Sequence, residues 1–153
     1  MQTSYSQYME PAIAGTLYDI SYHRVDSYAV ETDNIYPGMG VIIGTNKEKQ
    51  VKLAAATTTT IKGIVMLQAK EQDASGNVFY KDKDTVPVLN KGRIWVNVIE
   101  AVTAESQAFL IFSGADKGKW AAAAGTGPIA SAITGAKFIT STTGAGLAVV
   151  ELN

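Results

Sequence analysis

The chain has 153 residues, enough for one domain with a hydrophobic core, and it carries 13 basic and 14 acidic residues. This near-neutral charge gives no electrostatic basis for binding nucleic acid or an anionic membrane, so we expect neither partner. The absence of cysteine excludes disulfides and thiolate sites, and no apolar run approaches the roughly 18 residues that span a bilayer. The N-terminal sequence also lacks the basic and apolar regions of a signal peptide.

Residues 1–36 are rich in tyrosine and follow neither a helical nor a strand period. Tyrosine has a large apolar body and a polar tip, which suit it to interfaces. We therefore predict an extended N-terminal arm over residues 1–36 and a β domain over residues 37–153, divided by the Pro37-Gly38 turn. Six of the seven tyrosines lie in this arm: Tyr5, Tyr8, Tyr18, Tyr22, Tyr28 and Tyr36.

Two placements of the arm are open, on its own domain or on a neighbouring subunit. Ordering the backbone costs about 1–2 kcal/mol per residue, and tyrosine burial alone does not offset this over 30 or so residues. On its own domain the arm would also have to bury Ile13, Leu17, Ile20, Val25 and Val30. We favour a neighbouring subunit, and we predict these interface residues: Tyr5, Tyr8, Ile13, Leu17, Tyr18, Tyr22 and Tyr28.

The residues after Pro37-Gly38 read as short strands separated by turns of Gly, Pro, Asn, Asp and Ser. β-Branched and alternating residues mark the strands, and no segment keeps a helical period over 12 or more residues. The segment 121–134 is rich in alanine and is predicted as a surface loop. The predicted strands cover residues 39–44, 50–53, 57–67, 84–89, 92–99, 107–112, 119–122, 135–140 and 146–152.

This pattern predicts an all-β fold, a small antiparallel β-barrel or sandwich, jelly-roll-like, with the extended N-terminal arm. The sequence shows no internal repeat. The segment 92–99 is the clearest strand: Ile94, Val96 and Val98 share one face, and the other face is also partly apolar. We expect both of its faces to be covered.

Chemistry-bearing residues are sparse. His23 is the sole histidine and has no evident catalytic or metal-binding partners, so we assign it to a surface or an interface. Asp73, Ser75 and Asn77 have the spacing of a calcium loop, but Gly76 is at the wrong position, and a hairpin turn fits better. We find no paired carboxylates or nucleophile motif. We therefore expect no enzyme, no cofactor and no metal.

Several stretches together resemble the structural cement proteins of tailed bacteriophages, also called capsid decoration proteins. The resemblance follows the family's order along nearly the whole chain, and residues 117–134 match it least. It is carried by AIAGTLYD (12–19), QVKL (50–53), DTVPVL (84–89), KGRIWVNVIEAV (91–102) and GAKFITSTTGAGLAVVELN (135–153).

The resemblance implies a structural protein that binds the outside of the expanded phage head and clamps adjacent major capsid protein subunits. It further implies a homotrimer over threefold and quasi-threefold positions, located on the virion exterior after synthesis in the bacterial cytoplasm. An alternative class is a carbohydrate- or receptor-binding β module of a phage fibre or head. That reading predicts an exposed aromatic cluster on a rigid loop, whereas the loops here are rich in Ala, Thr and Gly.

Overall fold

A computed structural model describes residues 12–31, 34–125 and 129–153. Within these ranges the chain forms strands and turns without a helix, and hence without any helix that could cross a membrane. The expected all-β fold is confirmed. The strands are β1 (Arg24–Val30), β2 (Gly40–Ile43), β3 (Gln50–Lys52), β4 (Gly63–Val65), β5 (Thr85–Val98), β6 (Gln107–Ile111), β7 (Trp120–Ala121), β8 (Ala130–Phe138) and β9 (Gly146–Leu152).

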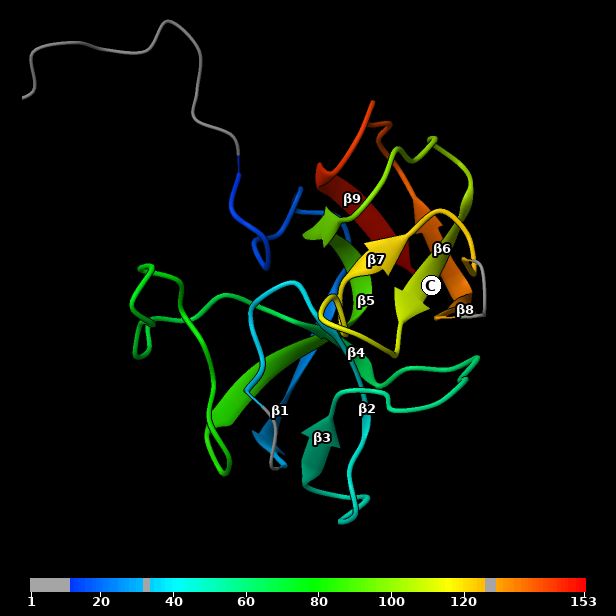
Figure 1. The fold of residues 1–153 in the computed structure, drawn as a ribbon. Coiled ribbons are helices and arrows are strands. Elements are labelled where there is room, and N and C mark those ends of the chain that lie inside the picture. Colours follow the sequence, from blue (N-terminus) through cyan, green and yellow to red (C-terminus); the bar gives the residue numbers. More distant parts are fainter. Residues whose placement is uncertain (1–11, 32–33, 126–128) are drawn as a thin grey trace, which may run out of the picture.

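The nine strands close into two barrels that share β5 (Figure 1). In the first barrel the neighbours run β1-β3-β2-β4-β5, and β5 returns to β1. In the second barrel they run β5-β7-β6-β8-β9, and β9 returns to β5. β5 is long enough for both barrels because residues 85–91 pair with β1 and residues 92–98 pair with β9.

The two barrels repeat one pattern of connections. The first strand of each pairs in parallel with the third, as β1 with β3 and β5 with β7. It also pairs antiparallel with the fifth, as β1 with β5 and β5 with β9. The remaining neighbours are antiparallel in both barrels. The sequence shows no repeat, yet the order and direction of strands in the second barrel reproduce those in the first.

Each barrel has its own hydrophobic cluster. The cluster of the first barrel is formed from β1 to β5 and from Ile35 and Tyr80 in its loops. That of the second barrel is larger and contains Trp120, Phe138 and the inward side chains of the second half of β5. Ile64 and Leu89, which belong to strands of the first barrel, also join the larger cluster. Strands of the first barrel therefore help to build the core of the second barrel.

Gly92 lies where β5 passes from one barrel to the other. Its φ of +126° favours glycine, and a Cβ there would lie 2.8 Å from the Cβ of His23. The register with β1 also shifts here, because Arg24 faces Lys91 whereas Val25 faces Leu89. Such a bulge bends a strand and increases its twist, which lets one strand serve two closed barrels.

The predicted arm overlaps this fold. Residues 24–30 form β1, and Val30 and Ile35 are fully buried. Earlier in the chain, Leu17 forms an isolated antiparallel bridge with Ile94. Much of the segment at 12–36 is therefore part of the first barrel or lies along β5, while residues 1–11 fall outside the described ranges.

Candidate functional site

The predicted interface residues have different surroundings. Tyr5 and Tyr8 lie outside the described residues. Ile13, Tyr18 and Tyr22 expose 63%, 42% and 75% of their surface. The remaining two contact the protein's own cores: Leu17 is partly buried against the larger cluster, and Tyr28 is partly buried against the smaller one. Ile13, Tyr18 and Tyr22 can therefore meet a partner without a change in the fold.

A five-residue loop, residues 19–23, projects between two stretches that pair with β5. Before the loop, the amide of Tyr18 donates to the carbonyl of Arg93 at 3.1 Å. After it, Arg24 opens β1 opposite Lys91. The loop therefore spans only the short stretch of β5 between Arg93 and Lys91, so its residues must leave the sheet. We call residues 19–23 the apolar loop, because it displays Ile20 at 99% exposure together with Tyr22.

Asp19 fixes the shape of the apolar loop. Its carboxylate accepts hydrogen bonds from the backbone amide of Ser21, at 3.0 Å, and from the Ser21 hydroxyl. Such a bond from an amide two residues on is the mark of an Asx turn. These bonds from Ser21, with a smaller contribution from Arg93, hold the pKa of Asp19 below its ordinary value.

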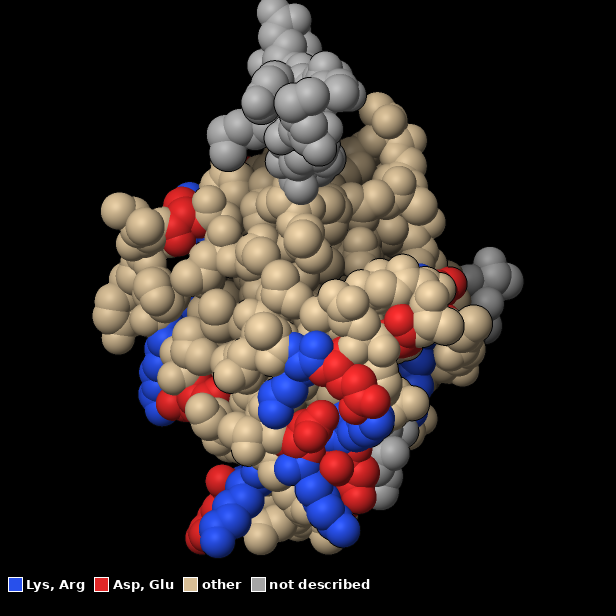
Figure 2. Space-filling view, turned by 90° about the vertical axis from the view of Figure 1, so that its left-hand side faces the viewer, with Lys and Arg blue, Asp and Glu red and all other residues tan. Residues whose placement is uncertain are grey.

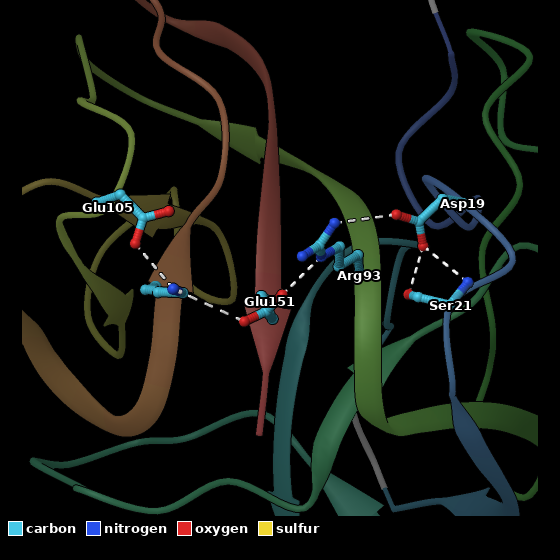
Figure 3. A network of polar contacts seen from close by, with 6 residues as sticks. Asp19, Ser21, Arg93, Glu105 and Glu151 are labelled. Carbon is cyan, nitrogen blue, oxygen red and sulfur yellow. Dashed lines mark hydrogen bonds and ion pairs between the residues drawn. The ribbon is translucent and has the colours of Figure 1, made fainter.

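A chain of charged side chains ties the apolar loop to the second barrel (Figure 3). The Arg93 guanidinium contacts Asp19 at 3.1 Å on one side and Glu151 of β9 at 2.6 Å on the other. Lys137 of β8 then contacts Glu151 at 3.9 Å and Glu105 at 2.8 Å. Glu151 first, and Asp19 second, raise the pKa of Arg93. The network is partly exposed to solvent, so it orients the loop more than it adds to folding stability.

Neighbouring rings support the base of the same loop. Tyr18 packs edge-on against Trp95 with ring centroids 5.5 Å apart. The Lys91 ammonium lies over the ring of Tyr22, 5.2 Å from its centroid. Both contacts lead back to β5. The exposed side chains are therefore presented on a supported loop rather than on a loose chain.

A groove of about 830 Å³ lies beside the segment that leads into the loop. Ala12 and Ile13 form part of its wall, and Asp73 closes it as part of the predicted turn. The Asp73 carboxylate accepts hydrogen bonds from the amides of Ser75 and Asn77, which confirms the turn. Its wall also includes the larger apolar residues Pro37, Met39, Leu67, Val78 and Leu147.

Charged side chains are unevenly distributed over one face of the molecule. Figure 2 shows most Lys, Arg, Asp and Glu side chains of this face in its lower half, whereas the upper half is largely uncharged. Among residues 12–31, 34–125 and 129–153, no group of three or more His, Asp or Glu side chains is placed to hold a metal ion.

Sequence reasoning did not select Ile20 as an interface residue. It grouped Ile20 with Ile13, Leu17, Val25 and Val30 as side chains that an arm folded on its own domain must bury. Val30 is buried, but Ile20 is almost fully exposed and Val25 is 38% exposed. The available signal was local: Asp19 and Ser21 flank Ile20, and this pair favours a turn that directs the isoleucine outward.

Comparisons with known proteins agree with this architecture. A family model described as "Structural cement protein (E217 gp24/Pam3 gp6)" matches residues 1–153. Among solved structures, a chain from "The capsid of Myoviridae Phage XM1" superimposes with a TM-score of 0.76 and 22% identity. The match covers 100% of this chain and 97% of the other, and at that identity it shows a shared fold. No curated protein matches the chain.

Proposed function

Because this chain belongs to the bacteriophage structural cement protein family, we propose that it binds the outer surface of the phage head and cements adjacent major capsid protein subunits. The role is structural, and it needs neither catalysis nor a cofactor. In this proposal the protein is made in the bacterial cytoplasm and ends on the exterior of the virion. Nucleic acid and membrane are not partners.

The observation that carries the proposal is the apolar loop. Ile20 is almost fully exposed to water, which is unfavourable for an apolar side chain. Its complete burial in a pocket of a partner would favour binding by about 1.5–3 kcal/mol. Tyr22 adds an aromatic side chain of the kind that is enriched at interfaces. Asp19 and Arg93 hold the loop in place before binding, which reduces the entropy lost on association.

We assign the capsid-contacting role to the segment ahead of β1, rather than to all of residues 1–36. Residues 24–29 already pair with β5 and cannot leave without opening the first barrel. Ile13, Tyr18, Ile20 and Tyr22 then form the described part of the contact surface. Tyr5 and Tyr8 stay predicted interface residues in the same segment.

The proposal includes a homotrimer, in which three apolar loops engage several capsid subunits at once. Each contact need only be modest, since linked contacts raise the effective concentration of the second and third binding events. Such a trimer resists separation of neighbouring subunits when DNA fills the head. The protein would therefore act by distributing load rather than by forming one tight bond.

Co-sedimentation with expanded, undecorated heads of the cognate phage tests the proposal. We expect saturable pelleting of the wild type, and loss of pelleting in the double variant Ile20→Asp, Tyr22→Asp. A matched control is Ala56→Asp, which adds a carboxylate to another exposed position. Absence of wild-type pelleting at micromolar protein would contradict the proposal and would favour a search for a glycan or receptor. Equal pelleting of all three proteins would place the contact elsewhere on the surface.

A further inference from the structure

One edge of β1 lacks a neighbouring strand over most of its length. On one side β1 pairs with β5 from Arg24 to Ala29. On the other side it pairs with β3 only at Ala29 and Val30. Within the part of the chain that the structure describes, no strand therefore pairs with residues 24–28 along this edge. The barrel is closed at one end of β1 and open at the other.

The direction of the backbone groups shows which residues face this open edge. The amide of Ala29 donates to Lys49 beside β3 at 2.8 Å, whereas the amide of Val30 donates to Asp84 beside β5 at 2.9 Å. Since these directions alternate along a strand, the N–H and C=O groups of Val25 and Ser27 point away from β5. Among the described residues, no strand is paired with β1 at these two positions on that side.

Soluble proteins normally protect such an edge with proline, lysine or a covering loop, because it is a template for another strand. Here the edge carries neither proline nor lysine between Arg24 and Tyr28, and both Val25 and Ser27 are exposed. Arg24 and Asp26 contact each other at 3.2 Å on the opposite pleat face. The edge is thus suited to pairing, and its charges limit which strand it can accept.

We propose that β1 pairs antiparallel with β1 of a second copy of this chain, across a local twofold axis. The register places Val25 opposite the partner's Val25, so the two residues exchange both backbone hydrogen bonds. It also places Arg24 opposite the partner's Asp26, and the same ion pair recurs on the other side of the axis. A twofold contact of this kind is self-complementary, as isologous interfaces require.

The charges select this register from its neighbours. In an antiparallel pair, a residue whose backbone groups point to the shared edge must lie opposite another such residue. The allowed registers are therefore those in which one strand slides by two residues relative to the other. Sliding the partner strand by two residues in one direction places Asp26 opposite the partner's Asp26. Sliding it by two residues in the other direction places Arg24 opposite the partner's Arg24. Like charges directly opposite destabilise a strand pair. The register centred on Val25 avoids both conflicts and gains two opposite-charge pairs.

This inference rests on the proposed function, because so short a contact needs a high local concentration. On a phage head, cement copies held side by side would meet this condition. A twofold contact cannot build the trimer itself. It would instead join chains of neighbouring trimers, and β1 would connect separate cement units into a continuous network over the capsid.

Single-cysteine variants test the pairing, since the native chain has no cysteine. In the proposed register the two positions 25 have Cα atoms about 5.5 Å apart, which a disulfide can bridge. The two positions 27 are offset by four residues, roughly 13 Å, which is too far. Decorated heads under mild oxidation should give disulfide-linked dimers of Val25→Cys, on the order of tenfold more than of Ser27→Cys.

A charge swap tests the register in the Val25→Cys background. Adding Arg24→Glu should suppress the dimer, because it sets two carboxylates opposite each other. Adding both Arg24→Glu and Asp26→Arg should restore it. Equal cross-linking of Val25→Cys and Ser27→Cys, or no dimer on heads that do bind the protein, overturns the inference. A third result would assign the open edge of β1 to a strand of the capsid protein instead. In that result no dimer forms, and Ser27→Pro abolishes pelleting whereas Ser27→Ala does not.

Failure of the proposed function gives a different result. The wild type and all variants would then stay in the supernatant. The same comparison in concentrated free protein, where pairing needs no head, would still decide the β1 contact: dimers of Val25→Cys in excess over Ser27→Cys support it, and their absence overturns it.

Discussion

The indole nitrogen of Trp120 donates a hydrogen bond to the carbonyl oxygen of Gly38 at 3.1 Å, and this bond joins the two barrels. Trp120 belongs to β7 in the second barrel and is fully buried. Gly38 lies just ahead of β2 in the first barrel, where its amide donates to Val65 of β4. The tryptophan ring thus packs in one core while its polar end is fixed to the other barrel.

Replacing Trp120 with phenylalanine should destabilise the whole protein. The change leaves the Gly38 carbonyl without its partner and creates a void in the larger core, for a loss of about 2–4 kcal/mol. Urea denaturation would measure it. Trp95→Phe is the matched control, because Trp95 is only partly buried and should cost less. An equal loss of unfolding free energy in the two variants would show that the hydrogen bond to Gly38 contributes little to stability.

Tyr80→Phe should remove a buried hydroxyl that serves two backbone groups. The hydroxyl donates to the carbonyl of Met66 and accepts from the amide of Gln68, each at 2.8 Å. Without it both groups lose a buried partner, at a cost of about 1–3 kcal/mol. Thermal unfolding followed by circular dichroism would show the drop. Tyr36→Phe, which removes a partly buried hydrogen bond to the carboxylate of Asp73, should change the midpoint less.

Gly92→Ala should strain the crossing point of β5. A side chain at φ +126° costs roughly 1–3 kcal/mol, and the new Cβ would press on His23 at the end of the apolar loop. We expect lower stability together with weaker head binding. Gly144→Ala is the control, since a Cβ at that position would have no other atom within 4 Å. Unchanged unfolding of Gly92→Ala would contradict this account of the bend.

The apolar loop should loosen in acid. The folded protein depresses the pKa of Asp19, chiefly through hydrogen bonds from Ser21, so ionised Asp19 favours the ordered loop. This contribution is fully present above the ordinary carboxylate value near 3.8 and is lost as the pH falls through the lower folded pKa. The amide resonance of Ser21 should report the transition by NMR. In Asp19→Asn this titration should vanish, whereas Glu48→Gln should leave it intact.

Most strands could be predicted because their residues alternate or are β-branched. The predicted segment 146–152 coincides with β9, and the segments 84–89 and 92–99 are two parts of the single strand β5. β1 was missed, because Arg24, Asp26 and Ser27 break the apolar alternation of a strand with an open edge. The predicted loop over 121–134 is wrong for the first half of β8, since the small side chains there carry little hydrophobic signal although Ala130 and Ile133 are buried.

The candidate site was only partly predictable for a related reason. Tyrosine composition selected the segment that contains the apolar loop, and Tyr18 and Tyr22 are exposed there, so their contact with a partner stays a prediction. Composition could not separate Tyr28, which packs inward, from Tyr22, because β1 had not been recognised. An arm deletion over residues 1–30 would consequently remove β1 as well. A truncation that ends before Ala12 keeps β1 and the apolar loop, and it tests only the predicted contacts of Tyr5 and Tyr8.

The sharing of β5 also limits how this sequence can evolve. An insertion or deletion of one residue between Thr85 and Val98 would turn alternate side chains from the core to the surface in the part of the strand that follows it. Both barrels depend on that one alignment, so no local repair in a single barrel could absorb the shift. Length variation among relatives should therefore collect in the loops, while this 14-residue strand keeps its length.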